Sequence, residues 1–286
     1  MTQQKLKELE AKLNLDYESA SFEIVEVNEF PELEEIPRGK AVRLTNVGYG
    51  FFDLRGFTAW SEQKRDKTVF KVLEPTLGTL TRVIRLHGGN IEKPTGDGLM
   101  FVVGANEPDP EKVVVRTLQC AIDLGQVMAD VVNPYMKRKG HISEELSWGI
   151  GLEMGNALVA KVGIRNHDFL TSISKAANFA SKLENAAGLN QILVGEGLYE
   201  KAPPEIKECL VFQGLLPHTS REYYELKPKT DANGKPTLLK AMSGEQVRRY
   251  GLGEWLLGGV IAAAALQGVK ALAQAKPHRW YGDEGE

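Results

Sequence analysis

Residues 50–58 place the strongest constraint on the fold, because an apolar run ends there in a carboxylate and then meets a glycine. The segment reads Gly-Phe-Phe-Asp-Leu-Arg-Gly-Phe-Thr. It predicts a buried strand that ends near Asp53, a turn at Gly56, and a helix with Thr58 as a possible cap. Backbone N–H groups at a helix start favour anions, so Gly56, Phe57 and Thr58 are candidates for binding phosphate.

A second carboxylate lies in a predicted tight turn. Residues 93–98, Lys-Pro-Thr-Gly-Asp-Gly, separate two apolar segments, which indicates a β-hairpin of residues 90–93 and 99–103 with Asp97 at its tip. Mg²⁺ and Mn²⁺ prefer oxygen ligands, and Mg²⁺ usually takes one or two protein carboxylates together with substrate phosphates. We therefore expect Asp53 and Asp97 to share two divalent metal ions beside a nucleoside triphosphate. The alternative is structural, with one aspartate capping a helix and the other filling a turn.

The remaining pattern predicts an α+β fold rather than a doubly wound α/β fold, since antiparallel hairpins alternate with helices. Gly155 and Asn156 are interpreted as the turn of a second hairpin, between strands at 146–152 and 157–162. The other expected elements are a strand within 41–53, helices at 59–86, 108–139 and 172–187, and strands at 191–194 and 223–226.

The two ends of the chain are predicted to lie outside the main domain, which we place at residues 40–230. Residues 1–39 combine a short amphipathic helix, a possible dimer contact, with an acidic linker. Residues 244–286 form an apolar helix and a tail. The apolar run at 255–269 would rise only about 22 Å as a helix, against a hydrocarbon core of about 30 Å. This favours packing or oligomerisation over membrane contact.

Composition narrows the classes of partner. The chain has 286 residues and a formal net charge of −3, and its longest basic run is Lys137-Arg138-Lys139, so nucleic acid is not an expected partner. The two cysteines lack the spacing of a zinc site. The N-terminus lacks the apolar stretch and cleavage site of a signal peptide, which predicts a cytoplasmic protein.

Four segments, in order, resemble the catalytic domain of class III nucleotidyl cyclases, over about residues 45–230. The resemblance implies a ferredoxin-like core, an antiparallel homodimer and two composite sites at its interface. It places two metal ions, Mn²⁺ or Mg²⁺, at Asp53, Leu54 and Asp97. The segments are a metal motif at 51–58, a second one from 88–89 and Lys93 through 96–100, a hairpin at 149–155 and a helix at 177–184.

The resemblance also assigns the helix residues Asn178 and Lys182, which would orient the ribose and stabilise the transition state from the partner subunit. They lie four residues apart, on one helix face. Lys182 stands where arginine is usual, and lysine keeps the charge without the bidentate fork. A further lysine of the family has no clean counterpart at 216–222, where His218 and Arg221 are the nearby candidates.

By the same resemblance, Lys93 and Thr171 face the nucleotide base, and this pair of residues is typical of cyclases that select adenine. Tyr49 lies four residues before Asp53, at a position that is usually small or aliphatic. Its phenol would shorten the base pocket to one ring, although core packing is an equal alternative.

The helix start at 173–176, Ile-Ser-Lys-Ala, resembles that of the bacterial antiphage cyclases of the Pycsar system. We therefore expect a pyrimidine nucleotide cyclase that prefers UTP, then CTP, and takes part in antiphage defence. Adenylate cyclase is the alternative activity. The non-enzymatic alternative is a degenerate module that binds nucleotide without turnover. Lys182 in place of arginine and the lack of the family's further lysine favour this alternative.

Overall fold

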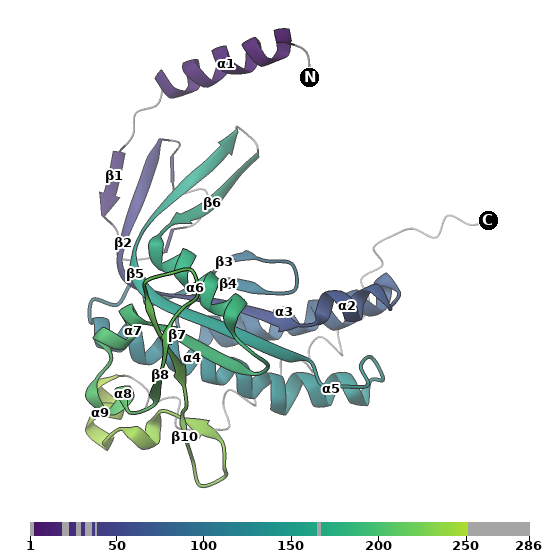
Figure 1. The fold of residues 1–286 in the computed structure, drawn as a ribbon, viewed down its shortest axis with the longest axis vertical. Helices are drawn as coiled ribbons and strands as arrows, with labels where there is room; N and C mark the ends of the chain where they lie inside the picture. The colour runs from purple at the N-terminus through teal and green to yellow at the C-terminus, as the bar shows by residue number, and fades with distance from the viewer. Residues whose placement is uncertain are drawn as a thin grey trace, which may run out of the picture.

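The computed structural model describes residues 3–18, 23–26, 30–31, 36–37, 39–164 and 167–250. Its centre is a mixed sheet in the order β3-β4-β2-β5-β7-β9-β8, with β1 added to β2 and β6 to β5 (Figure 1). The strands are β1 Glu23–Glu26, β2 Lys40–Arg55, β3 Asn90–Pro94, β4 Leu99–Val103, β5 Ser147–Ile164, β6 His167–Ile173, β7 Gln191–Gly195, β8 Leu210–Leu215 and β9 Glu222–Leu226, with the separate pair β10 Lys229–Thr230 and β11 Pro236–Thr237.

Helices cover both faces of the sheet. The pair α3 and α4 packs on one face and α6 on the other (Figure 1). The helices are α1 Gln3–Glu18, α2 Phe57–Glu62, α3 Asp66–Leu86, α4 Pro110–Val127, a π-helical turn Met128–Val132, α5 Asn133–Arg138, α6 Lys175–Ala186, α7 Glu196–Lys201, α8 Pro204–Lys207, a 3₁₀ turn Leu239–Ala241 and α9 Gly244–Arg249.

The alternation of side chains along β2 explains the two layers. Phe52 and Leu54 point into the larger core with α3 and α4, whereas Val47 and Tyr49 point into the core beneath α6. The α6 helix lies close to the sheet because Gly151 has no side chain. A Cβ atom there would come within 2.1 Å of the Glu184 backbone nitrogen.

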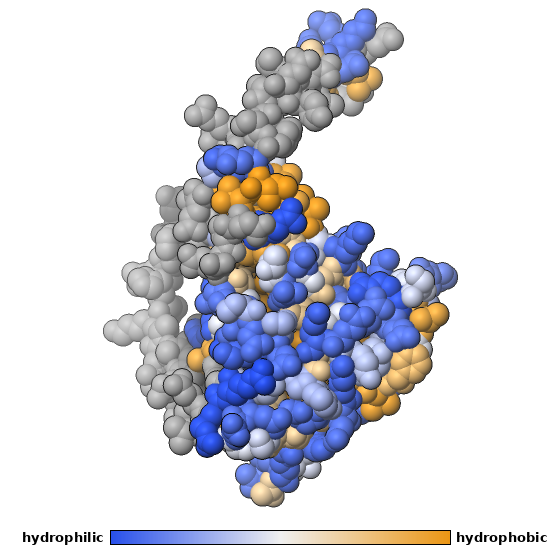
Figure 2. All heavy atoms as spheres, turned by 90° about the vertical axis from the view of Figure 1, so that its left-hand side faces the viewer, coloured by the Kyte–Doolittle hydropathy of each residue, from blue (hydrophilic) through white to orange (hydrophobic). Residues whose placement is uncertain are grey.

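A ribbon of strands extends beyond the sheet (Figure 1). It consists of the first part of β2, the last part of β5, and the strands β1 and β6 that pair with them. Apolar side chains gather on it (Figure 2), and Val162, Phe169 and Ile173 are among the exposed ones. Leu6 and Leu9 of α1 are exposed as well.

The predicted turn at Gly155 and Asn156 is wrong, because β5 runs through it without interruption. The irregularity lies on the opposite strand, where β2 has a register shift next to Asn46, whose backbone N–H donates to Asn156 Oδ1 at 3.0 Å. Gly155 is needed for packing instead, since a Cβ atom there would lie 2.9 Å from the Cβ of Ala176. The hairpin partner of β5 is β6.

The α+β prediction is confirmed, and so is the hairpin of β3 and β4. The helix expected at 59–86 is divided into α2 and α3, and the one at 108–139 contains a π-helical turn. The predicted helix at 172–187 begins later, because Ser172 still belongs to β6 and Ser174 caps α6. Strands β1 and β6 were not predicted.

Within the described residues, no helix combines the length and the apolar character needed to cross a membrane. The predicted apolar helix at 255–269 and most of the tail lie outside the described residues.

Candidate active site

The carboxylate half of the site lies where the end of β2 meets the β3–β4 turn. The Thr95 N–H donates to the Gly98 carbonyl at 3.0 Å and closes the turn that holds Asp97. Gly96 has a φ of 84°, which favours glycine. A Cβ atom on Gly98 would lie 2.3 Å from the Phe52 carbonyl oxygen and 2.9 Å from Asp53 Oδ1. The turn therefore packs directly against the strand that carries Asp53.

The two aspartates lie close enough to affect each other. Partial burial, together with the charges of Asp97 and Glu184, raises the pKa of Asp53 to about 6 against the opposing charge of Arg55. A divalent cation would remove this repulsion, so the donor set fits a metal. No group of three or more His, Cys, Asp or Glu side chains suited to a metal occurs in the described part of the chain. The other ligands would then be backbone, water or substrate phosphate.

Arg55 joins the carboxylate half to α6. Its Nη1 lies 3.5 Å from Asp53 Oδ2 and 2.6 Å from Glu184 Oε1, and its Nη2 donates to the Glu184 backbone carbonyl. Gly149 of β5 makes room for the guanidinium, since a Cβ atom there would lie 2.0 Å from Nη2. The sequence analysis did not predict that Arg55 and Glu184 belong to the site. The i, i+2 spacing of Asp53 and Arg55 on a strand placed them on one face, but nothing pointed to Glu184.

The other predicted residues of this segment lie at the start of α2. Gly56 precedes the helix with a φ of 70°, Phe57 is buried and Thr58 is exposed at the second helical position. Thr58 is therefore not the cap. The Leu54 side chain is buried in the core, which leaves only its backbone carbonyl as a possible metal ligand.

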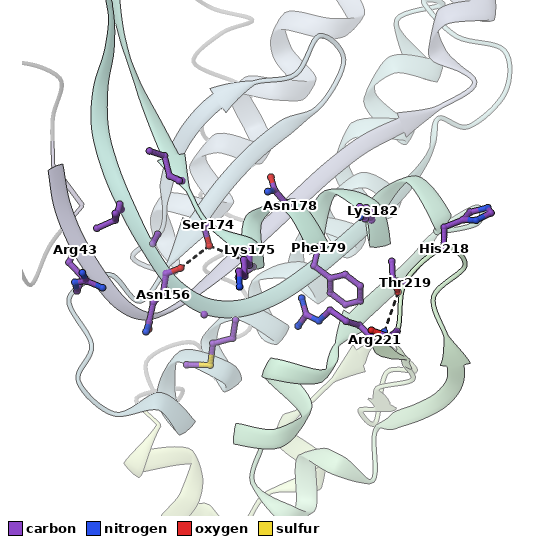
Figure 3. Close-up of a pocket in the computed structure, with 17 residues that line it drawn as sticks. Arg43, Asn156, Ser174, Lys175, Asn178, Phe179, Lys182, His218, Thr219 and Arg221 are labelled. Carbon is purple, nitrogen blue, oxygen red and sulfur yellow. Dashed lines mark hydrogen bonds between the residues drawn. The ribbon is translucent and has the colours of Figure 1, made fainter. Parts of the chain in front are cut away.

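The second half of the site is a pocket of about 1180 Å³ between α6, the middle of β5 and the β8–β9 turn (Figure 3). Asn178 and Lys182 line it from the exposed face of α6. Ser174 caps this helix through its hydroxyl, which also donates to the Asn156 carbonyl at 2.8 Å. Neither Asp53 nor Asp97 lines the pocket.

Two residues are candidates to replace the family's lysine that this chain lacks at 216–222, and their surroundings differ. Arg221 is paired with two carboxylates, Glu153 through Nη2 and Glu196 through Nε at 2.6 Å, and its guanidinium lies 3.8 Å from the centre of the Phe179 ring (Figure 3). His218 is exposed, has a φ of 62° and lines the same pocket. Its ring points away from Arg221 (Figure 3). Arg221 is therefore already engaged by two carboxylates.

The residues predicted to select the base lie on three strands. Lys93 of β3 is exposed and Thr171 of β6 is half-buried, whereas Tyr49 of β2 is fully buried against α6. Burial raises the pKa of Tyr49, and Ser172 and Glu92 lie close to its phenol. The phenol oxygen has no hydrogen-bond partner among the described residues.

The family model of the adenylate and guanylate cyclase catalytic domain matches residues 40–227, about two thirds of the chain. The chain belongs to this family. Its fold agrees: the cyclase domain is similar to the crystal structure of the adenylyl cyclase CyaB from P. aeruginosa, with a TM-score of 0.59 and 24% identity over 69% of this chain and 99% of that one.

Two relatives carry the names of pyrimidine cyclases. A uridylate cyclase of Burkholderia cepacia is 25% identical over 66% of this chain and 81% of its own length. A cytidylate cyclase of Escherichia coli is 24% identical over 64% of this chain and 42% of its own length. The cyclase domain is thus a class III nucleotide cyclase domain.

Proposed function

We propose that the protein converts UTP, and more slowly CTP, to a 3′,5′-cyclic nucleotide and pyrophosphate, as a homodimer that acts in antiphage defence. Residues 40–230 would form the catalytic domain. The observation that carries the dimer is the separation of the two halves of the site. The pocket with Asn178 and Lys182 contains neither Asp53 nor Asp97. A second copy related by twofold symmetry would bring the carboxylates of one subunit to the pocket of the other.

Exposed apolar side chains support this dimer. Val162, Phe169 and Ile173 lie on the ribbon, and Leu6 and Leu9 lie on α1. Contiguous exposed apolar surface marks interaction sites in soluble proteins. The ribbon and α1 are therefore the surfaces that we expect the second copy to cover.

In the proposed reaction, the ribose 3′-hydroxyl attacks the α-phosphorus and its proton passes to solvent water. The bond between the α-phosphorus and the oxygen that bridges to the β-phosphate breaks, and pyrophosphate leaves with that oxygen. Asp53 and Asp97 would hold the metal ions, which lower the pKa of the hydroxyl and neutralise phosphate charge when bound. Asn178 would orient the ribose. Lys182 would place a positive charge near the α-phosphate, where negative charge develops.

Base choice rests on Tyr49, Lys93 and Thr171. Lysine only donates, so Lys93 suits the carbonyl oxygens of uracil and cytosine as well as N1 of adenine. Tyr49 fills the space beneath α6, and its phenol oxygen lies near Ser172, next to Thr171. Its bulk would disfavour the second ring of a purine. The names of the two pyrimidine cyclases among the relatives support the same choice.

The test is incubation of the purified protein with Mn²⁺ and each labelled nucleoside triphosphate, followed by separation of the products. We expect cyclic UMP first and cyclic CMP second. Conversion of ATP alone would refute the pyrimidine assignment. Tyr49→Ala should admit purines, and unchanged selectivity would refute the role of that side chain.

Two other functions have specific support. Lys93 with Thr171 is the pair typical of adenine, which favours an adenylate cyclase. The engagement of Arg221 by Glu153 and Glu196 removes one candidate cation, which favours a module that binds nucleotide without turnover. If none of the four triphosphates gives a cyclic product, the module that binds nucleotide without turnover is favoured.

A further inference from the structure

A polar contact ties together two strands that are not neighbours in the sheet. Glu92 of β3 accepts two hydrogen bonds from Ser172 of β6, one from the backbone N–H at 2.9 Å and one from the hydroxyl. β3 pairs only with β4, and β6 only with β5, within the described part of the chain. Both residues are half-buried, and the buried phenol of Tyr49 lies beside them.

A bulge in β3 makes this contact possible. Ile91 pairs with Phe101 and Lys93 pairs with Met100, so Glu92 is the extra residue on its strand. A bulge redirects side chains without ending the ladder. It allows Glu92 to turn toward β6 while Lys93 stays paired.

The contact lies next to both residues that face the base in the proposed function. Lys93 follows Glu92, and Thr171 precedes Ser172. Ser172 itself pairs with Val159 of β5, so the position of β6 is fixed by the ladder on one side and by Glu92 on the other. The separation of Lys93 and Thr171 therefore depends on the length of the Glu92–Ser172 contact.

We infer that Glu92 and Ser172 form a clamp that sets the separation of Lys93 and Thr171 and thereby the base selectivity of the enzyme. This inference rests on the proposed function of the same site. Both carboxylate oxygens of Glu92 are engaged by Ser172, so Glu92 acts as a positioning residue rather than on the base. A carboxylate suits this role because it accepts at two oxygens with a fixed geometry.

Loss of the clamp should affect selectivity more than turnover. Asp53 is held by Arg55, and the turn that carries Asp97 is closed by the hydrogen bond from Thr95 to Gly98, so neither contact involves Glu92. Without the clamp, β3 and β6 can separate, and the site can admit a larger base. A displacement of about 1 Å can change a rate by about a hundredfold, so a tenfold loss of selectivity is a reasonable expectation.

The experiment is a competition between UTP and ATP in one tube, with the ratio of the two cyclic products as the readout. This ratio does not depend on the fraction of folded enzyme. Glu92→Ala should lower the preference for UTP about tenfold, and Ser172→Ala, which keeps the backbone hydrogen bond, about threefold. The double variant should match Glu92→Ala, because both changes break one contact.

Two variants serve as controls. Glu92→Gln should keep most of the preference, since its amide can accept from the Ser172 N–H and donate to the hydroxyl oxygen. Glu145→Ala removes an exposed ion pair with Lys137 and should leave the ratio unchanged.

The clamp would be overturned if the product ratio of Glu92→Ala stays within about twofold of the native ratio, because the expected change is about tenfold. Additive effects of Glu92→Ala and Ser172→Ala would also overturn it, because they indicate separate contacts with the base.

Failure of the proposed function looks different. If the native enzyme prefers ATP, the pyrimidine assignment fails, and the clamp then predicts that Glu92→Ala still lowers the share of cyclic UMP in the products. If no product forms, the same ratio is measured from displacement of a fluorescent nucleotide by UTP and by ATP, and equal ratios in all variants refute the clamp.

Discussion

The carboxylate half and the cationic half of the site are held in opposite ways. Asp53 has 29% of its side chain exposed and is fixed by Arg55, which is itself paired with Glu184. Asn178 and Lys182 stand on the exposed face of α6 beside an open pocket. The first half is organised within one chain, whereas the second is open to groups from outside it. The difference supports the proposal that a second copy completes the cationic half.

The prediction with the largest expected effect tests whether the two halves of one site come from different chains. Asp53→Ala should lower turnover about a thousandfold or more, because metal binding and charge neutralisation are lost. Lys182→Ala damages the other half. If each site is composite, mixing the two inactive variants should restore up to about a quarter of native activity, since one site in each mixed dimer is intact.

The control for this test is Asp66→Ala, which changes an exposed aspartate in the first turn of α3 and should leave turnover unchanged. Turnover is measured as pyrophosphate release. If the mixed variants form dimers and no activity returns, the two halves do not come from different chains.

The second prediction concerns the cation of the open half. Lys182→Ala should lower kcat about a hundredfold with a smaller change in KM, because the charge acts mainly on the transition state. Lys182→Arg should stay within about tenfold of native, since it keeps the charge. Lys201→Ala, an exposed lysine of α7, is the matched control. An equal loss for Lys182→Ala and Lys182→Arg would show that the charge is not what matters.

The third prediction tests the packing that joins the halves. Gly151→Ala should lower the free energy of unfolding by about 3 kcal/mol, because its Cβ would meet the backbone of α6. Gly78→Ala in α3 would place its Cβ in ordinary contact, 3.7 Å from Arg82 Nη1, and should raise that free energy by about 0.5 to 1 kcal/mol. Chemical denaturation measures both. A neutral Gly151→Ala would mean that α6 can move away from the sheet at little cost.

The smallest expected effect concerns Glu153, which is fully buried against Arg221. Burial raises the pKa of Glu153 to about 7, against the opposing charge of Arg221. The folded state therefore holds this proton more tightly than the unfolded state. The resulting stability is complete below about pH 4.5 and is lost as pH rises to about 7. The free energy of unfolding should thus fall by about 2 kcal/mol between about pH 5 and about pH 6.5 on account of Glu153, at about 1.4 kcal/mol per pH unit.

Glu153→Gln should remove this contribution, so the difference between native and variant proteins should change with pH. Glu196→Gln alters the more exposed partner of Arg221 and should keep the pH dependence. Parallel curves for native protein and Glu153→Gln would contradict the shifted pKa.

The sequence predicted the features that depend on local pattern. The β3–β4 hairpin followed from glycine and aspartate between apolar runs, and the placement of Asn178 and Lys182 on one face of α6 followed from helical spacing. The position of Asp97 at a hairpin tip follows from the same local signal.

Features that depend on distant contacts could not be predicted in this way. Arg55 and Glu184 are separated by more than a hundred residues, and neither shows a local sign of the other. Gly155 resembles a turn residue in sequence, yet its role is to let Ala176 approach. The contact of Glu92 with Ser172 depends on a bulge that has no distinct sequence signal. In each case, the cause is the packing of a residue remote in the chain.

The continuous β5 strand has a consequence for how this protein can vary. Its 18 residues carry Gly149 beneath Arg55, Gly151 and Gly155 beneath α6, and Glu153 beneath Arg221. All four have the same parity and so share one face of the strand. Insertion or deletion of a single residue between Gly149 and Gly155 would turn those on one side of the change to the opposite face. Variation in length should therefore be confined to the loops and termini, with β5 inherited as an uninterrupted unit.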